Sequence, residues 1–288
     1  MKTYQISDTG GEGHHFRMSR MERIYERNEG KPDKPHRHDY FTIIWVKSGI
    51  GSHQIDFNSY PIENDLVFFL SPRQVHQIVA KQKPIGCVIN FTHEFIARNN
   101  IDKRFIHNIN LFQSYGTNPP IKLPKSLSNK ISDITDEMYQ VYTDRFEYRE
   151  EALAAYLRLL LIYTNFVSPD NIHDDLNQGP ALVRDFKNLV EEGFREKHKV
   201  KEFAELLHVT PNHLNQVIKE YIGRSAKDYI QDCITLEAKR LLIHSDLSNK
   251  EIAYQLGFRE PVHFSTFFKN QIGQSPKEFK ELNNPDFL

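Results

Sequence analysis

The sequence of 288 residues predicts an α+β protein in which a β-barrel comes first and helices follow. Three observations predict this class. Short runs rich in Ile, Val, Phe and Trp alternate with Gly/Pro turns between residues 34 and 91, apolar residues recur at helical spacing from residue 124 onward, and one pattern occurs twice near the C-terminus. The length is enough for two domains, and 39% hydrophobic residues exclude a disordered chain.

The N-terminal part of the chain predicts the barrel. Its first thirty residues are polar and indicate a loose arm or an early strand. The β-prone runs that follow are separated by breaker-rich segments at 47–52, 58–61 and 71–73. Regular short strands with Gly and Pro turns are typical of a β-barrel or jelly roll. The predicted strands are residues 41–46, 53–57, 65–70, 76–79 and 86–91.

A group of polar residues is expected inside this barrel. By strand alternation His36, His38, Tyr40 and Thr42 share the inward face, and His76 follows later in the chain. The arrangement resembles the two cupin motifs, in which H-x-H with a later Glu and a downstream His bind a metal, but Thr42 stands where the Glu would be expected. We therefore predict no metal and no cofactor, and we interpret the group as lining an effector pocket. The effector-pocket candidates are His36, His38, Tyr40 and His76.

Two alternatives for these residues stay open. Three histidines could form an open zinc-type or iron-type site, because catalytic metals often use three protein ligands and a water. Each residue could also be a core side chain with a satisfied hydrogen bond. Other histidines, such as His53, have no partner spacing and are expected to do nothing specific.

Residues 124–167 become helical in pattern. Two amphipathic helices are predicted, and their apolar stripes could cover the barrel or pair with a second subunit. A polar, breaker-rich linker follows at 169–180. The expected domains are a sensor at 1–123, a helical, possibly dimerising segment at 124–168, the linker, and a helical domain at 181–288. The stripes are Leu127, Ile131, Ile134, Met138 and Val141, then Leu153, Tyr156, Leu157, Leu160, Leu161 and Thr164.

The segment from Ser248 to Gly273 predicts a helix-turn-helix. Ser248 can cap a helix over residues 249–256, Gly257 ends it, and a second helix begins at Pro261. Two short helices with a tight turn are a common way to present a helix to a DNA major groove. The pattern of residues 250–277 also occurs at 201–227, so two such units are expected.

A long helix over residues 225–244 is expected between the two units. At about 1.5 Å per residue it spans about 30 Å, close to the roughly 34 Å between successive major-groove faces of B-DNA. One chain could therefore place both recognition helices, the second helix of each unit, on one face of a duplex.

At these residues the sequence resembles the AraC/XylS family of bacterial transcription regulators. The family signature A-x-x-x-G-F, F-x-x-x-F-K and G-x-S-P is found as Ala253…Gly257-Phe258, Phe264…Phe268-Lys269 and Gly273-Gln274-Ser275-Pro276. The resemblance implies a DNA-binding domain of two helix-turn-helix units joined by a long helix, a cupin-like sensor domain, and dimerisation through the helical segment. The family usually has an arginine at the position of Cys233, which departs from the pattern.

The outward faces of the recognition helices give the candidate DNA-binding residues. Asn and Gln suit adenine edges, and apolar groups suit the thymine methyl. The family often carries arginine near Gln216 and Thr266, and its absence here removes the usual guanine contacts, so an A/T-leaning site is predicted. The candidates are Asn212, Asn215, Gln216 and Lys219 in the first unit and Val262, His263, Thr266 and Lys269 in the second.

The expected function is a cytoplasmic, effector-responsive transcription regulator that is not an enzyme. Its predicted partners are double-stranded DNA, an unknown small-molecule effector, a second copy of the chain, and RNA polymerase if it is an activator. No apolar leader or spanning stretch supports a membrane location. The alternative is a metal-dependent cupin enzyme with an accessory helical domain. The three inward histidines keep that alternative open, but no acid/base pair supports it.

Overall fold

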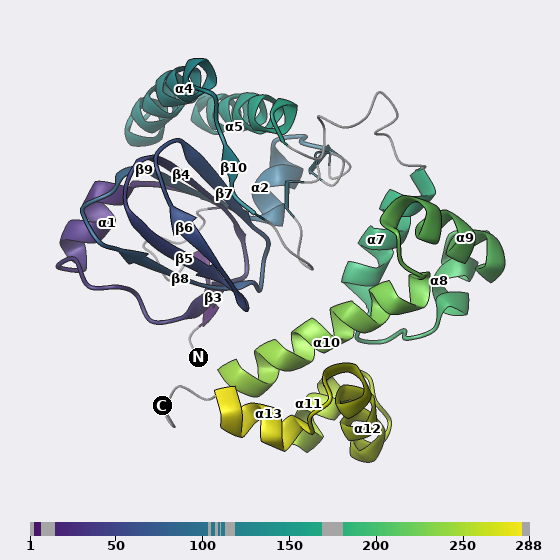
Figure 1. The fold of residues 1–288 in the computed structure, drawn as a ribbon. Helices are drawn as coiled ribbons and strands as arrows, with labels where there is room; N and C mark the ends of the chain where they lie inside the picture. Colours follow the sequence, from purple (N-terminus) through teal and green to yellow (C-terminus); the bar gives the residue numbers. More distant parts are fainter. Residues whose placement is uncertain are drawn as a thin grey trace. The chain divides into compact units, whose positions relative to one another are not determined.

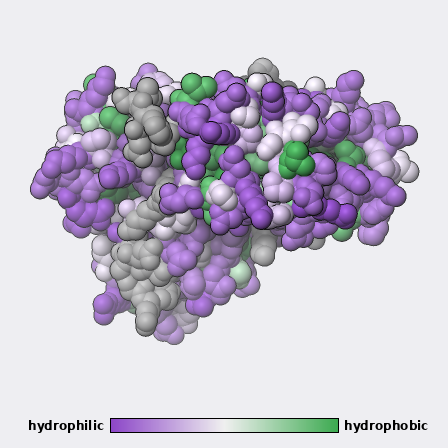
Figure 2. Space-filling view, turned by 90° about the horizontal axis from the view of Figure 1, so that it is seen from below, coloured by the Kyte–Doolittle hydropathy of each residue, from purple (hydrophilic) through white to green (hydrophobic). Residues whose placement is uncertain are grey.

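The computed structural model describes residues 3–6, 15–102, 105–106, 109, 111–112, 119–168 and 181–283. The chain divides into two compact units, with the division between residues 177 and 178 (Figure 1). The predicted linker at 169–180 lies outside the described residues. Most of the face seen in Figure 2 is hydrophilic, and its hydrophobic residues lie in small separate patches.

The described strands of the N-terminal unit form two five-stranded sheets. The α+β class with an N-terminal cupin-like β-domain is confirmed, and of the two expected forms the described strands fit the jelly roll, because no hydrogen-bonded pairing joins the edges of the two sheets within the described residues. In order across the first sheet, the strands are β1 (Thr3–Tyr4), β3 (His36–His38), β8 (Val75–Ala80), β5 (Gly51–Ile55) and β6 (Asn58–Ile62). The second contains β10 (Ile121–Lys122), β7 (Leu66–Leu70), β4 (Phe41–Ser48), β9 (Ile85–Phe91) and β2 (Phe16–Arg20).

Strand β4 is central in its sheet and contributes to two cores. Ile43 and Trp45 belong to a cluster that continues into the helices α4 (Lys125–Thr143) and α5 (Arg149–Phe166). Ile44 and Val46 belong to a second cluster with residues of both sheets, including Ile55 and Phe68. Successive side chains of a strand point to opposite faces, so an unbroken apolar run fits a strand buried on both sides. Figure 1 shows α4 and α5 lying over the second sheet.

Several elements of this unit differ from expectation. The segment 58–61, expected as a turn, is strand β6, and the chain reverses earlier, at Asp56, whose φ is 52°. Pro61 is compatible with a strand here because β6 lies at the sheet edge. Helices α1 (Met21–Arg27) and α2 (His93–Arg98) were not expected. Both are short, so their apolar periodicity gives little signal.

The C-terminal unit is helical throughout its described residues. Its helices are α7 (Ala181–Gly193), α8 (Val200–Leu206), α9 (Pro211–Ile222), α10 (Ala226–His244), α11 (Asn249–Gln255), α12 (Pro261–Ile272) and α13 (Pro276–Asn283). The pairs α8–α9 and α11–α12 form the two predicted helix-turn-helix units, and α10 connects them. The predicted caps are present: the Ser225 hydroxyl accepts from Asp228 N, and Ser248 and Glu251 form a capping box.

The turn of the second unit depends on a close backbone approach. Gly257 follows α11 with φ +79°, and a Cβ at this position would lie 2.0 Å from the backbone oxygen of Arg195. Only glycine accommodates both the left-handed conformation and this contact. The turn therefore packs directly against the segment that follows α7.

Candidate nucleic-acid interface and histidine cluster

The first recognition helix, α9, is oriented by its caps and its apolar face. Its N-cap, Thr210, accepts a hydrogen bond from His213 N, and Gly223 ends the helix with φ +75°. Leu214 and Ile218 are fully buried. Three of the four candidate residues of this helix lie exposed, as predicted: Asn212, Gln216 and Lys219.

Asn215, the fourth candidate of α9, is placed differently. Its side chain is half-buried, and its Oδ1 accepts a hydrogen bond from the backbone N–H of Ala226 at 3.0 Å. This N–H belongs to the first turn of α10, where backbone donors have no partner within the helix. Asn215 therefore joins the recognition helix to the connecting helix. Its spacing on α9 could not show this, because the contact spans eleven residues.

The second recognition helix, α12, begins with Pro261 and ends at Gly273 in the left-handed conformation. Phe264 and Phe268 are fully buried, which fixes the face that packs on the core. All four candidates are exposed on the other side, and Val262 has 63% of its surface accessible. They are Val262, His263, Thr266 and Lys269.

Two details of α12 affect what its surface can contact. The Thr266 hydroxyl donates to the Val262 carbonyl oxygen at 2.9 Å, so it is engaged within the helix. The Thr266 methyl and the Val262 side chain remain as apolar groups. Lys219 and Lys269 lie in the last turns of α9 and α12, and neither forms a salt bridge with a described residue. Apolar groups followed by a cation suit a base edge beside a phosphate.

A buried ion network connects α10 to the segment that follows α7. Oε1 of Glu237 accepts a hydrogen bond from the Arg195 guanidinium. Oε2 of Glu237 lies 3.4 Å from Nη1 of Arg240. Glu237 and Arg240 have only 2% and 1% of their side chains exposed. Breaking such a pair from one side leaves a buried uncompensated charge, which is strongly destabilising. Sequence spacing identified neither this network nor its role.

Both cysteines are buried free thiols. Cys233, at the position where the resemblance implies an arginine, is fully buried in α10, and burial raises the pKa of its thiol. Burial likewise raises the pKa of Cys87 to about 12. The site of Cys233 is therefore part of the core in this chain.

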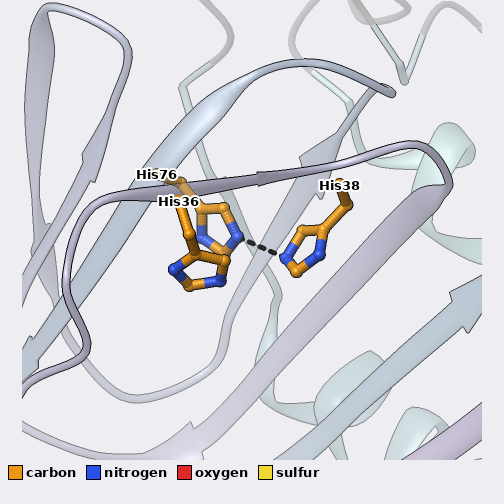
Figure 3. A group of neighbouring side chains, drawn as sticks. All are labelled: His36, His38 and His76. Atoms are coloured by element: carbon orange, nitrogen blue, oxygen red, sulfur yellow. Dashed lines mark hydrogen bonds between the residues drawn. The ribbon is translucent and has the colours of Figure 1, made fainter. Parts of the chain in front are cut away.

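In the N-terminal unit, β3 and β8 place the predicted histidines together (Figure 3). His36 lies opposite His76 in the antiparallel pairing, and the Nε2 atoms of His38 and His76 are 2.8 Å apart. Tyr40 is 2% exposed, and its ring centroid lies 4.5 Å from that of His38. The structure therefore brings all four predicted effector-pocket residues into one cluster.

His53 also belongs to this cluster, so the expectation that it does nothing specific is wrong. It lies on β5, next to β8, and its Nε2 is 3.1 Å from Nδ1 of His76. The side chain is fully buried. The alternation of β5 could have indicated an inward position for His53, but its partner depends on the strand register, which local sequence does not show.

Three histidines of the cluster, His38, His53 and His76, are neutral at pH 7. Burial, followed by the nearby His36, lowers the pKa of His38 and of His53 to about 3. Burial also lowers the pKa of His76 well below its ordinary value, and its three histidine neighbours lower it further. A neutral imidazole has one donor and one acceptor nitrogen. The Nδ1 atoms of His38 and His53 are buried without a hydrogen-bond partner in the described structure.

The same residues could hold a metal ion. His36, His38 and His76 each offer one ring nitrogen, and these atoms lie within 4.8 Å of one another. Neutral imidazole is the form that binds zinc or iron, so this donor set fits such an ion. Thr42 replaces the carboxylate of the cupin pattern, and it is buried with its Oγ1 unpartnered. The predicted absence of a metal stays a prediction.

Comparison with known proteins matches each of the two units to a protein family. Residues 20–160 match the family model described as AraC-like ligand binding domain, and residues 203–281 match the one described as Helix-turn-helix domain. The chain belongs to the AraC family of transcription regulators. This AraC-family chain is therefore a DNA-binding transcription regulator, as predicted, and the comparisons do not support the alternative of a cupin enzyme.

Its curated relatives are similar over most of their length. The HTH-type transcriptional activator RhaS of Enterobacter sp. (strain 638) is 23% identical over 254 residues, which cover 85% of this chain and 87% of the relative. The HTH-type transcriptional regulator YfiF of Bacillus subtilis (strain 168) is 22% identical over 256 residues, covering 86% and 78%. The relatives named as activators are consistent with a regulator and not an enzyme.

Two solved structures are also similar. The C-terminal domain of AraT, a response regulator from Geobacillus stearothermophilus, is 27% identical, covers 38% of this chain and 90% of its own, and has a TM-score of 0.36. ToxT from Vibrio cholerae O395 is 18% identical, covers 94% and 99%, and has a TM-score of 0.41. Among the described helices of the regulator, none combines the length and apolar character needed to span a bilayer.

Proposed function

We propose that this AraC-family regulator contacts duplex DNA with both recognition helices and responds to a small effector through its N-terminal unit. The observation that carries the proposal is the same in α9 and α12. Each helix buries its apolar side in the core and exposes the candidate DNA-contacting side chains on the opposite side. We assign sensing to residues 1–123, subunit contact to 124–168 and DNA binding to 181–288. A regulator of this kind acts in the cytoplasm, where the DNA is.

The chemistry of the two faces favours A/T-rich contacts. Asn212 and Gln216 are amides that suit adenine, whereas Val262 and the Thr266 methyl suit the thymine methyl group. Lys219, His263 and Lys269 are assigned to phosphates, which position the helices without selecting sequence. Asn215 keeps an amide nitrogen that can donate, but its oxygen is used by Ala226. We assign its main contribution to the orientation of α9.

The length of the connecting helix supports simultaneous contact with DNA by both helix-turn-helix units. Helix α10 has 19 residues, which at about 1.5 Å each span about 28 Å. Successive major-groove faces lie roughly 34 Å apart, so two recognition helices held at the ends of α10 suit adjacent grooves. The buried Glu237 network and the close approach at Gly257 join α10 and the turn after α11 to the same segment, at Arg195.

A second copy of the chain is proposed to pair through α5. Its residues Leu159, Ile162 and Phe166 are exposed by 42%, 49% and 79%, while Leu153, Leu157 and Leu161 fill the core. The exposed residues recur at spacings of three and four, so they form a stripe along one side of the helix. Burying this stripe against the same stripe of a partner would remove apolar surface from water.

The effector response is proposed to act by population shift. An effector that binds one arrangement of the regulator more tightly shifts the equilibrium toward it, and the DNA affinity changes with it. The cluster of His36, His38, Tyr40 and His76 remains our proposed effector contact, because these polar groups are held together inside the sensor unit. RNA polymerase would be a further partner if the regulator is an activator.

Selection of bound sequences from random and self-upstream duplex DNA, with the full-length protein at several salt concentrations, tests the DNA proposal. An A/T-leaning site with two contact blocks about ten base pairs apart, and an affinity that falls with salt, is expected. Gln216→Ala should relax the preference at one position, since a good base contact contributes about 1–3 kcal/mol. Enrichment of G-rich sites would contradict the assigned base contacts. No enrichment at all would contradict the proposal that the two recognition helices bind a specific DNA sequence.

A further inference from the structure

The sensor unit has a cavity of about 330 Å³ that is separate from the histidine cluster. It is lined by β2, by α1, by Ile6, and by Tyr139 and Tyr142 of α4. This volume lies at the lower end of the range found for sites of small organic molecules. The lining residues that the structure describes all belong to the N-terminal unit.

The lining of this cavity is strongly positive. Four of the described lining residues are arginines and none of the described ones is acidic: Arg17, Arg20, Arg23 and Arg27. Guanidinium groups present paired donors that match a carboxylate or a phosphate, and several around one concave site favour an anion over a neutral molecule. The cavity also contains the apolar side chains of Phe16, Met18 and Ile24, and these suit the body of an organic ligand.

The charges near the cavity are arranged in a way that keeps it positive. Arg20 pairs with Asp136 of α4 at 2.6 Å, while Arg23 and Arg27 form no ion pair with a described residue. The acidic residues of α1 are engaged elsewhere. Glu26 pairs with Lys83, and Glu22 accepts a hydrogen bond from Gly86 N at 3.4 Å. Helix α1 therefore directs its arginines and its carboxylates to different neighbours.

One aromatic ring, that of Tyr139, lies against two of the arginines. The guanidinium carbon of Arg20 lies 4.5 Å from the ring centroid of Tyr139, and that of Arg23 lies 5.8 Å from the same ring. Such stacking orients a guanidinium and leaves its edge for hydrogen bonds. A ring that contacts both arginines also reduces the entropy lost when a ligand orders them.

We propose that this cavity binds a small organic anion, with a carboxylate or phosphate group on the arginines and an apolar body against Phe16, Met18 and Ile24. The proposal adds a second ligand site to the N-terminal unit, beside the histidine cluster, and rests on the proposed effector response only for the consequence in DNA binding. A ligand here touches β2 and α1 on one side and α4 on the other. Since α4 packs on α5, a ligand bound here can bias the position of α5, the helix that carries the exposed apolar stripe.

Calorimetric titration of the full-length protein, without DNA, tests the site. The probes are benzoate and phenyl phosphate, with neutral benzyl alcohol as the matched uncharged compound. At least one anion is expected to bind, and the alcohol is not. The double variant Arg23→Gln/Arg27→Gln should weaken anion binding about tenfold or more, because charge-assisted hydrogen bonds contribute on this scale. The control, Arg98→Gln/Arg145→Gln, removes the same charge from exposed positions outside the cavity and should leave the affinity unchanged.

Three results would overturn the proposal: no anion bound at millimolar concentration, equal binding of the alcohol, or equal loss in both double variants. Unfolding curves of both variants exclude misfolding as the cause. DNA affinity, measured with and without the bound anion, is a separate arm. Anion binding that depends on Arg23 and Arg27 supports the site even where DNA affinity does not change, and that result would contradict only the regulatory response.

Discussion

The side-chain oxygen of Asn215 accepts a hydrogen bond from the backbone N–H of Ala226 at 3.0 Å. This bond links the middle of the first recognition helix to the first turn of the connecting helix. The sequence pattern placed Asn215 among the base contacts, because the apolar residues Leu214, Val217 and Ile218 define the core face of α9 and leave Asn215 outside it. The structure gives it a second task, since this contact joins α9 to the start of α10.

Replacing Asn215 should therefore cost stability. Asn215→Ala removes the acceptor of a backbone donor at a helix N-terminus, and we expect a loss of about 1 kcal/mol in the free energy of unfolding. Asn212→Ala is the matched control, because Asn212 is exposed on the same helix and should change stability little. Denaturant unfolding of the full-length variants measures both. Equal stability of the two variants would show that the bond to Ala226 contributes nothing.

Lys269→Ala should weaken binding to all DNA sequences to a similar degree. Lys269 is exposed in the last turn of α12, where a phosphate contact is expected. Losing one such contact lowers the slope of log affinity against log salt by about 1. Lys81→Ala removes the same charge from an exposed position in the sensor unit and serves as the control. A loss confined to one DNA sequence would assign Lys269 to a base instead.

Ile162→Asp should convert a dimer of this regulator to a monomer. The substitution puts a charge into the middle of the exposed stripe of Leu159, Ile162 and Phe166, where it would be buried without a partner in a dimer. Gln140→Asp is the control, because it adds the same charge at an exposed position of α4, outside the stripe. Sedimentation over a range of protein concentrations distinguishes the two states. A wild-type protein that stays monomeric, or an Ile162→Asp dimer of unchanged affinity, would reject this surface.

The elements that the sequence predicted well are those determined by neighbours in the chain. Thr210, Ser225 and Ser248 bond to a backbone N–H only three residues away, so the starts of α9, α10 and α11 follow from local spacing. The buried phenylalanines of α12 likewise recur every four residues. For the same reason, the exposed faces of both recognition helices were predicted correctly except at Asn215.

The features that escaped prediction depend on contacts between distant residues. His53 meets His76 because β5 lies beside β8, and Arg195 meets Glu237 across 42 residues. Strand β6 was mistaken for a turn because Pro61 is a breaker in most strands, and its edge position is set by the whole sheet. The arginine cavity needs β2, α1 and α4 together, which no local pattern indicates.

The histidine cluster should make the sensor unit less stable in acid. His38 and His53 have pKa values of about 3 in the folded protein, against about 6.5 when unfolded. Below pH 6.5 the unfolded chain binds more protons than the folded one, so stability falls as pH falls, until both states are protonated near pH 3. Each group contributes about 1.4 kcal/mol per pH unit in this window.

His38→Gln tests this dependence because it removes one of the titrating groups and keeps a polar side chain. The slope of unfolding free energy against pH, measured between pH 6.5 and pH 4, should decrease by about one proton. His263→Gln, at an exposed position on α12, should leave the slope of the sensor unit unchanged. A slope that is the same for wild type and His38→Gln would show that His38 is not held neutral by the fold.

Gly257→Ala should destabilise the DNA-binding unit far more than Gly273→Ala. The two glycines have nearly the same backbone conformation, with φ of +79° and +82°, so both substitutions incur the strain of a left-handed residue, about 1 kcal/mol. Only Gly257 also faces a collision, because its new Cβ would lie 2.0 Å from the Arg195 backbone oxygen, whereas nothing lies within 4 Å at Gly273. Displacing Arg195 would in turn disturb its ion pair with the buried Glu237. Denaturant unfolding of both variants compares the losses directly, and equal losses would show that the turn moves away from Arg195 without cost.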